Sequence, residues 1–307
     1  MNVATRTTKR DWETAFTGWS KAPSPTERER CERAVKAVND AIRNDPTLAA
    51  KSIKVFGQGS YENRTNVRQN SDADVAIMHE NMIISDYNDG VTQQEVGLRN
   101  VAYSFSQYRD EVEHALVEHF GDEGVTPGNK AFDVHENTYR IDADAVPCFE
   151  YRLYFRKPDG TPDFVKGTAL YPRKGGKRVT NFPLQQYANG VTKNEATGQA
   201  YKGIVRIVKR LRGEMVEAGV ESAIEMPSFL IQSLIWNAPD PMFSGDSWRD
   251  AVKNVLAHLW ERTRSEAKRK GMMEENGIKY LFHEEQRWMP EQATQFLNDA
   301  WNRVNAG

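Results

Sequence analysis

Residues 56–60 read Phe-Gly-Gln-Gly-Ser, and residues 71–75 read Ser-Asp-Ala-Asp-Val. This pattern predicts a strand that runs into a Gly-Ser turn and a short polar helix, followed by a second strand that carries Asp72 and Asp74. Because successive side chains of a strand point to opposite faces, the two carboxylates project from the same side. Neighbouring carboxylates repel each other unless a divalent cation lies between them, and the N–H groups and hydroxyl of the turn suit a phosphate. The stretch therefore predicts metal-assisted chemistry on a nucleotide.

Two familiar motifs do not fit this stretch. An EF-hand calcium loop is excluded because Ala76, Ile77 and His79 replace its further oxygen ligands and its glycine. A P-loop is excluded because no Gly-Lys-Ser/Thr follows the Gly-Gln-Gly-Ser run. A lone pair of aspartates is usually a solvated turn, but a Gly-Ser turn, two aspartates and then an apolar strand over 75–78 form a far more specific combination.

A second acidic strand follows later in the chain. Residues 141–147 read Ile-Asp-Ala-Asp-Ala-Val-Pro, within a strand expected over 138–154. Asp142 and Asp144 share a face by strand alternation. Two-metal sites for phosphoryl transfer need a further carboxylate, and either aspartate could supply it or be a solvated strand residue.

Composition limits the class of protein. The chain has 307 residues with 39% hydrophobic and 27% charged content, as in ordinary globular enzymes, and its net charge of −2 disfavours a strongly basic nucleic-acid-binding surface. Cys31 and Cys148 suit neither a disulfide framework nor a zinc site. No apolar signal core or run of transmembrane length is found, so we expect a protein of the reducing cytoplasm.

Periodicity and turn residues predict the other elements. Ser24 as N-cap, with Pro25 next and Glu27 third, predicts a helix that ends near residues 45–46. Further helices are expected over 8–20, 93–120 (closed by Gly121), 198–215 and from about 227 to 236, strands over 130–136 and 138–154, and hairpins and loops over 155–181.

The predicted helix over 198–215 carries a basic stripe. Its cations Lys202, Arg206 and Lys209 are spaced at i, i+4 and i+7, so they share one side of the helix. The stripe is either a solvated basic face or a binding site for the phosphates of a ligand.

These motifs together resemble a known superfamily. The turn Gly59-Ser60 followed by Ser-Asp-Ala-Asp at 71–74 resembles the signature of the polymerase-β-type nucleotidyltransferases. Within it, the chain resembles the oligoadenylate synthetases and the bacterial relatives of cyclic GMP–AMP synthase, the CD-NTases, and residues 59–68 resemble the branch often labelled clade E. The resemblance implies an α+β fold: a polymerase-β-like core with a mixed β-sheet and helices in residues 1–180, and an α-helical lobe in residues 181–307. The active site is then expected in the cleft between them.

The resemblance also implies roles for particular residues. Asp144-Ala145-Val146-Pro147 matches the family pattern around the third catalytic aspartate, which favours Asp144 and leaves the role of Asp142 open. Lys209 matches the lysine that holds the donor triphosphate in oligoadenylate synthetases, with Lys202 and Arg206 as weaker candidates. The predicted catalytic and metal-binding residues are Asp72, Asp74 and Asp144, and the predicted nucleotide-binding residues are Gly59, Ser60, Lys209, Ser228, Phe229, Asn189, Lys202 and Arg206.

Four further residues are expected near the triphosphate or the base. Ser228 and Phe229 match a hydroxyl residue near the triphosphate and an aromatic residue that stacks on a base, although a helix cap and a core residue would look the same. Asn181 or Asn189, in the segment that covers the base pocket in this family, could select the base through hydrogen bonds.

The implied reaction is nucleotidyl transfer with two Mg²⁺ ions, for which Mn²⁺ could substitute. Asp72 and Asp74 bind both ions, Asp144 binds the ion that activates the acceptor hydroxyl, and pyrophosphate leaves from the donor. The resemblance implies two such steps from two nucleoside triphosphates, ATP and UTP or UTP alone. The product is then a cyclic dinucleotide second messenger, such as cyclic UMP-AMP or cyclic di-UMP, that activates a separate effector protein in antiphage signalling. We expect a monomer that holds no stable nucleic acid and binds no membrane.

Two other functions compete with this one. The chain could be a transferase that stops at linear oligonucleotides or tags another acceptor, such as tRNA or a small molecule. It could also be an inactive homologue that acts as a nucleic-acid-binding or scaffolding module, which the three intact carboxylates argue against. A DNA sensor like the animal synthase is disfavoured, because the chain lacks a cysteine-rich zinc element and a global positive charge.

Overall fold

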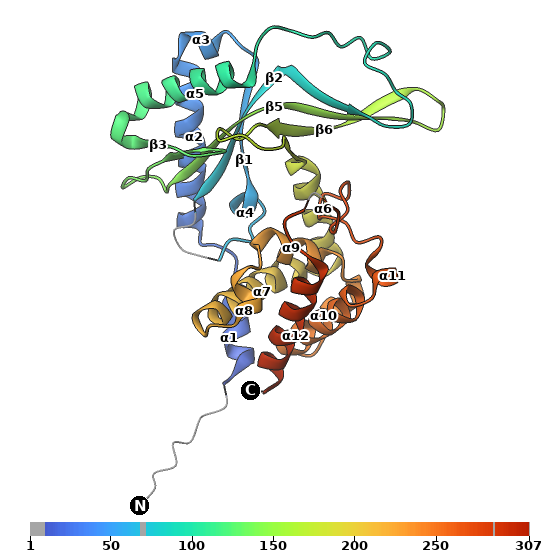
Figure 1. Cartoon of the computed structure of the whole chain (residues 1–307). Coiled ribbons are helices and arrows are strands. Elements are labelled where there is room, and N and C mark those ends of the chain that lie inside the picture. The colour runs from blue at the N-terminus through green and yellow to red at the C-terminus, as the bar shows by residue number, and fades with distance from the viewer. Residues whose placement is uncertain (1–9, 68–71, 285, 307) are drawn as a thin grey trace, which may run out of the picture. The chain divides into compact units, whose positions relative to one another are not determined.

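The computed structural model describes residues 10–67, 72–284 and 286–306 (Figure 1). Ser71, which belongs to the motif quoted above, lies outside them. The contacts divide the chain into two units: Pro23–Leu184, here called the sheet unit, and Met1–Ala22 with Gln185–Gly307, here called the helical unit. The sequence analysis predicted a boundary after residue 180, with the N-terminal residues as part of the nucleotidyltransferase core. The contacts place it after Leu184 and group the chain up to Ala22 with the helices.

The sheet unit contains a mixed sheet in the order β1-β2-β5-β4-β3, with β6 pairing β5 and β7 (Figure 1). Strands β2 and β5 run parallel, and the other pairs are antiparallel. The strands are β1 Ile53–Gln58, β2 Ala73–Tyr87, β3 Val125–Pro127, β4 Phe132–Val134, β5 Ala143–Arg156, β6 Pro162–Leu170 and β7 Val179–Asn181.

Helices α2 and α5 cover one face of this sheet, where their apolar side chains form a common core with Val75, Ile77 and Ala145. The start of α2 is as predicted, because the Ser24 side chain accepts a hydrogen bond from the N–H of Glu27. The helices of this unit are α2 Pro25–Asn44, α3 Pro46–Ala49, α4 Gly59–Glu62, α5 Phe105–Phe120 and the 3₁₀ turn η1 Asp122–Gly124.

Two predicted starts are wrong by five residues or more, and local hydrogen bonds explain both. The helix expected over 93–120 begins only at Phe105, because Ser104 and Gln107 form a reciprocal capping box that starts it there. The strand expected from residue 138 begins at Ala143, because the Asn137 side chain accepts hydrogen bonds from the two N–H groups at 139 and 140 and makes a turn. The predicted closure by Gly121 is confirmed: its N–H donates to the Val117 carbonyl.

The helical unit is built around α7 Ala200–Glu217, which is buried along most of its length. Its apolar residues pack with those of α1, α9, α10 and α12 in one core. The other helices are α1 Trp12–Trp19, α6 Pro183–Ala196, α8 Glu221–Ile224, α9 Ser228–Trp236, η2 Asp240–Phe243, α10 Trp248–Thr263, α11 Glu266–Arg269 and α12 Pro290–Ala306. In the described part of the chain, none of the helices has the length and apolar character needed to cross a bilayer.

Candidate active site

The register of the sheet brings three aspartates into one row. Asp74 of β2 lies directly opposite Asp144 of β5, and Asp144 lies opposite Asp133 of β4. The neighbours of these aspartates in each strand, such as Ala73 and Val75, pack into the core beneath α2 and α5. Strand alternation therefore places all three carboxylates on the other face of the sheet.

Asp72 belongs to the same cluster, although it precedes β2 rather than lying in it. Partial burial, and then the charges of Asp142 and Asp133, raise the pKa of Asp72. Burial, and then the charges of Asp72, Asp133 and Asp142, raise the pKa of Asp144. All the charged groups that shift these two pKa values are carboxylates, so the cluster repels itself.

The donors of this cluster fit a hard divalent cation, which prefers carboxylate oxygens and would relieve the repulsion. Among the described residues, no three acidic, histidine or cysteine side chains already stand close enough together to enclose an ion. Asp72, Asp74 and Asp144 thus have the chemistry of a metal site without a closed ligand shell.

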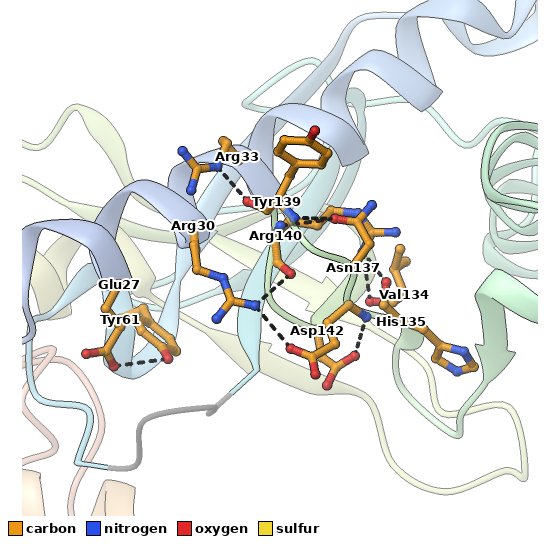
Figure 2. Close-up of polar contacts among 11 residues, drawn as sticks. Glu27, Arg30, Arg33, Tyr61, Val134, His135, Asn137, Tyr139, Arg140 and Asp142 are labelled. Carbon is orange, nitrogen blue, oxygen red and sulfur yellow. Dashed lines mark hydrogen bonds and ion pairs between the residues drawn. The ribbon is translucent and has the colours of Figure 1, made fainter.

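The Gly59-Ser60 turn lies against the carboxylate row. Gly59 has a φ of +69°, and a Cβ built on it would come within 1.9 Å of Oδ2 of Asp74. Only glycine tolerates both that backbone angle and that approach. The turn is held from α2, because Glu27 Oε1 accepts hydrogen bonds from the Tyr61 hydroxyl at 3.3 Å (Figure 2) and from the Asn66 amide at 2.9 Å.

Asp142, whose role the sequence left open, has a local partner. Its Oδ1 accepts a hydrogen bond from the N–H of Glu136 at 2.5 Å. Glu136 belongs to the loop between β4 and β5, and Figure 2 shows two arginines of α2 that bind this loop. Arg30 donates to the Arg140 carbonyl at 3.2 Å, and Arg33 donates to the Tyr139 carbonyl at 2.5 Å. One oxygen of Asp142 therefore fixes the loop that precedes β5.

Asp133 was not predicted as a site residue. It is exposed, between the buried Phe132 and Val134 of a strand of only three residues. The alternation of apolar, acidic and apolar residues was visible in the sequence. Its meaning depends on the pairing of β4 with β5, which the sequence did not reveal.

In the helical unit, the predicted basic stripe is real but buried. Lys202, Arg206 and Lys209 are 8%, 7% and 5% exposed, so the stripe is not a solvated face. The Arg206 guanidinium donates through Nε to the Ser20 carbonyl at 2.9 Å, and burial lowers the pKa of Arg206 to about 10. The Lys202 ammonium lies 5.6 Å from the centre of the Tyr187 ring.

Lys209, the predicted triphosphate residue, is part of a buried chain of hydrogen bonds. Its Nζ donates to Oε1 of Gln232 at 2.9 Å, and the Gln232 amide in turn donates to Glu275. Burial raises the pKa of Glu275, against the opposing influence of its hydrogen-bond donors and of the Lys209 charge.

The remaining predicted residues lie on separate elements. Ser228 is the exposed first residue of α9 and does not cap it, since Pro227 stands at the N-cap position. The ring of Phe229 lies 6.0 Å from that of Trp288. Asn181 ends β7 of the sheet unit, whereas the Asn189 amide in α6 of the helical unit donates to the Glu275 carbonyl at 2.8 Å.

Comparison with known proteins agrees with this fold. A family model described as the cGAS/DncV-like nucleotidyltransferase C-terminal helical domain matches residues 188–305. The chain is 41% identical over 296 residues to the cyclic dipyrimidine nucleotide synthase CdnE of Legionella pneumophila, covering 96% of this chain and 98% of the relative. It is 34% identical over 293 residues to the cyclic dipyrimidine nucleotide synthase CdnE of Cecembia lonarensis, covering 95% and 98%.

A solved structure is similar over almost the whole chain. It is the CdnE c-UMP-AMP synthase of Rhodothermus marinus with Apcpp and Upnpp, with a TM-score of 0.82, 27% identity and 96% of each chain covered.

The mixed sheet with its carboxylate row and the helical C-terminal half define a nucleotidyltransferase of the polymerase-β-like fold. Within that class, the chain belongs to the cGAS/DncV-like family, the CD-NTases, and is similar to its CdnE members. The predicted fold, enzyme class and family are therefore confirmed. The relatives are cyclic nucleotide synthases by name, which agrees with the predicted activity. Nucleotidyltransferases of this kind use a divalent metal ion, so the metal requirement also agrees.

Proposed function

We propose that this enzyme joins two nucleoside triphosphates into a cyclic dinucleotide with at least one pyrimidine base, with UTP as a substrate alone or together with ATP. The names of the relatives support this choice: two are cyclic dipyrimidine nucleotide synthases, and the structural relative is a c-UMP-AMP synthase whose structure holds Apcpp and Upnpp. The product would act on a separate effector protein in antiphage signalling, and the enzyme would work as a monomer in the cytoplasm.

The single observation that carries the proposal is the carboxylate row of the sheet. Asp74 and Asp144 are direct neighbours across parallel strands, and the backbone of Gly59 lies against Asp74. Asp72 and Asp74 would hold two Mg²⁺ ions, or Mn²⁺ in their place, and Asp144 would hold the ion that activates the acceptor hydroxyl. When bound, the ions supply charge neutralisation and lower the pKa of the attacking hydroxyl.

The residues of the chain contribute binding and orientation. Gly59 and Ser60 would bind the departing phosphates of the donor, and Lys209 would hold the same triphosphate through its ammonium group. Lys202 could add positive charge, whereas the bond of Arg206 to the Ser20 carbonyl supports a structural part for that residue. Such positioning and charge neutralisation account for most of the rate in phosphoryl transfer.

The choice of base would depend on two asparagines that differ in how many of their hydrogen-bonding groups are available to a nucleotide. Asn189 already donates to the Glu275 carbonyl, so it would offer mainly its amide oxygen to a base. Asn181 is exposed at the end of β7 and would offer both groups. Phe229 would stack on a base, and Ser228 would contact the triphosphate.

Product analysis tests the proposal. The enzyme is incubated with each of four labelled nucleoside triphosphates, singly and in pairs, with Mg²⁺ and with Mn²⁺. The products are separated before and after phosphatase treatment. Phosphatase-resistant products that require UTP are expected. Products that are all phosphatase-sensitive would instead identify a transferase that stops at linear products, and purine products without any use of UTP would overturn the proposed substrate.

A further inference from the structure

A buried polar chain connects three segments of the helical unit: α7, α9 and the segment between α11 and α12. The Tyr201 hydroxyl of α7 donates to Oε1 of Glu275 at 2.6 Å, and Nε2 of Gln232 in α9 donates to Oε2 of the same carboxylate at 2.6 Å. Oε1 of Gln232 then accepts from the Lys209 ammonium at 2.9 Å. Glu275 is fully buried, and Gln232 is 3% exposed.

The order of donors and acceptors along this chain permits only one orientation of the Gln232 amide. A carboxylate accepts hydrogen bonds and does not donate them, whereas an ammonium group donates and does not accept. The NH₂ end of Gln232 must therefore face Glu275, and its oxygen must face Lys209. A flipped amide would set NH₂ against the ammonium and oxygen against the carboxylate, losing two charge-assisted hydrogen bonds.

Glu275 also connects this chain to α6. The Gln186 side chain donates to its carboxylate, and the Asn189 amide donates to its main-chain carbonyl at 2.8 Å. Its own N–H donates to the Ser233 hydroxyl at 3.3 Å. One buried residue thus holds a base-binding candidate on α6 and, through Gln232, the triphosphate candidate Lys209 on α7.

We propose that Glu275 is a positioning residue for the donor triphosphate: by fixing the direction of the Gln232 amide, it aims the Lys209 ammonium at the phosphates. This inference rests on the proposed role of Lys209. It assigns a part in substrate binding to the segment between α11 and α12, which carries no sequence motif.

The test compares two buried glutamates that are adjacent in the chain. Glu275→Gln replaces the acceptor-only group with an amide and so removes one of the two groups that fix the orientation of Gln232, leaving only the Lys209 ammonium. Glu274→Gln is the matched control, since Glu274 is also buried but accepts hydrogen bonds from Asn276 and Gln286 within its own segment. Binding of a non-hydrolysable UTP analogue and of UMP is measured for each variant, together with kcat, KM and the melting temperature.

For Glu275→Gln we expect weaker binding of the triphosphate analogue by about tenfold, comparable with the loss of one charge-assisted hydrogen bond, with unchanged binding of UMP. KM for UTP should rise more than kcat falls, and Glu274→Gln should leave both affinities unchanged. Tyr201→Phe, which removes only the hydroxyl that holds the carboxylate, should shift triphosphate binding in the same direction by about threefold. If Glu275→Gln does not fold, the Tyr201→Phe result decides.

Restoring the order of donors and acceptors should restore binding. In the double variant Gln232→Glu/Glu275→Gln, the carboxylate at position 232 accepts from Lys209 and from the amide at position 275, whose oxygen accepts from Tyr201. Each donor again faces an acceptor, so triphosphate affinity should recover toward that of the parent enzyme. Equal loss of UTP analogue and UMP binding in Glu275→Gln, or no loss of either, would overturn the inference.

Lys209→Met separates this inference from the proposed function. If Lys209→Met binds the triphosphate analogue as well as the parent enzyme, the role of Lys209 in the proposed function fails. If Lys209→Met loses affinity and Glu275→Gln does not, only the positioning role of Glu275 fails.

Discussion

The aspartates around the carboxylate row of the sheet and the cations of the basic stripe on α7 differ in exposure and in their partners. The aspartates of the sheet are exposed or half-buried, and the charged groups that shift the pKa values of Asp72 and Asp144 are other carboxylates. The three cations of the α7 stripe, Lys202, Arg206 and Lys209, are at most 8% exposed, and Arg206 and Lys209 donate to a carbonyl and an amide oxygen. Repulsive, accessible carboxylates cost stability and are typical of a ligand site. A buried cation with a hydrogen-bond partner is instead held in one position, which would stabilise the fold at Arg206 and fix the direction of the ammonium group at Lys209.

The largest effect should come from the sheet. Asp74→Asn and Asp144→Asn should each lower the rate of pyrophosphate release at least about 10³-fold, since each removes a carboxylate that would hold metal and stabilise the transition state. For Asp144→Asn the free energy of unfolding should stay the same or rise, because the repulsion from Asp72, Asp133 and Asp142 is removed. Asp110→Asn on the exposed surface of α5 is the control, and substantial pyrophosphate release by the Asp72→Asn/Asp74→Asn double variant would refute the metal assignment.

The next effect tests the contact between the turn and the row. Gly59→Ala should lower activity by about 10²-fold, since the new Cβ would lie 1.9 Å from Oδ2 of Asp74 and displace that carboxylate. Gly90→Ala is a matched control: its φ is +72°, but nothing lies within 4 Å of the new Cβ. Both variants carry the same backbone strain, so a similar loss of activity in the two would mean that the approach to Asp74 does not matter.

Arg206→Met should show the opposite pattern from the aspartates. It leaves the Ser20 carbonyl without its guanidinium donor, so the free energy of unfolding should fall by about 1–3 kcal/mol. Turnover per folded molecule should change by less than about threefold, as expected of a residue whose effect is on folding. Denaturant titration and assays below the melting temperature measure the two quantities, and a rise in KM for UTP with unchanged stability would return Arg206 to the triphosphate site.

The smallest effect is expected at Asp142. Asp142→Asn keeps an oxygen that can accept from the N–H of Glu136, so activity should change by less than about threefold. Steady-state rates of Asp142→Asn and Asp144→Asn, measured side by side, compare these two neighbouring aspartates. A loss as large as that of Asp144→Asn would extend the catalytic row to Asp142.

Local sequence patterns were sufficient where short-range physics decides the structure. The N-cap at Ser24, the closure at Gly121 and the alternation that puts Asp74 on one face all depend on residues within a few positions of each other. The overlong helix over 93–120 was wrong for a related reason: a stronger local signal, the capping box of Ser104 and Gln107, started the helix later.

The sequence by itself determined the turn, the acidic strands, the basic stripe and, through them, the class of enzyme. Only the tertiary structure decided that Asp133 joins the row, that the stripe is buried, and that Glu275 holds Gln232 from 43 residues away and Tyr201 from 74. The reason is physical: strand alternation and helical spacing are set by the backbone within a few residues. Strand pairing and buried hydrogen bonds join distant segments, and no local pattern records which ones meet.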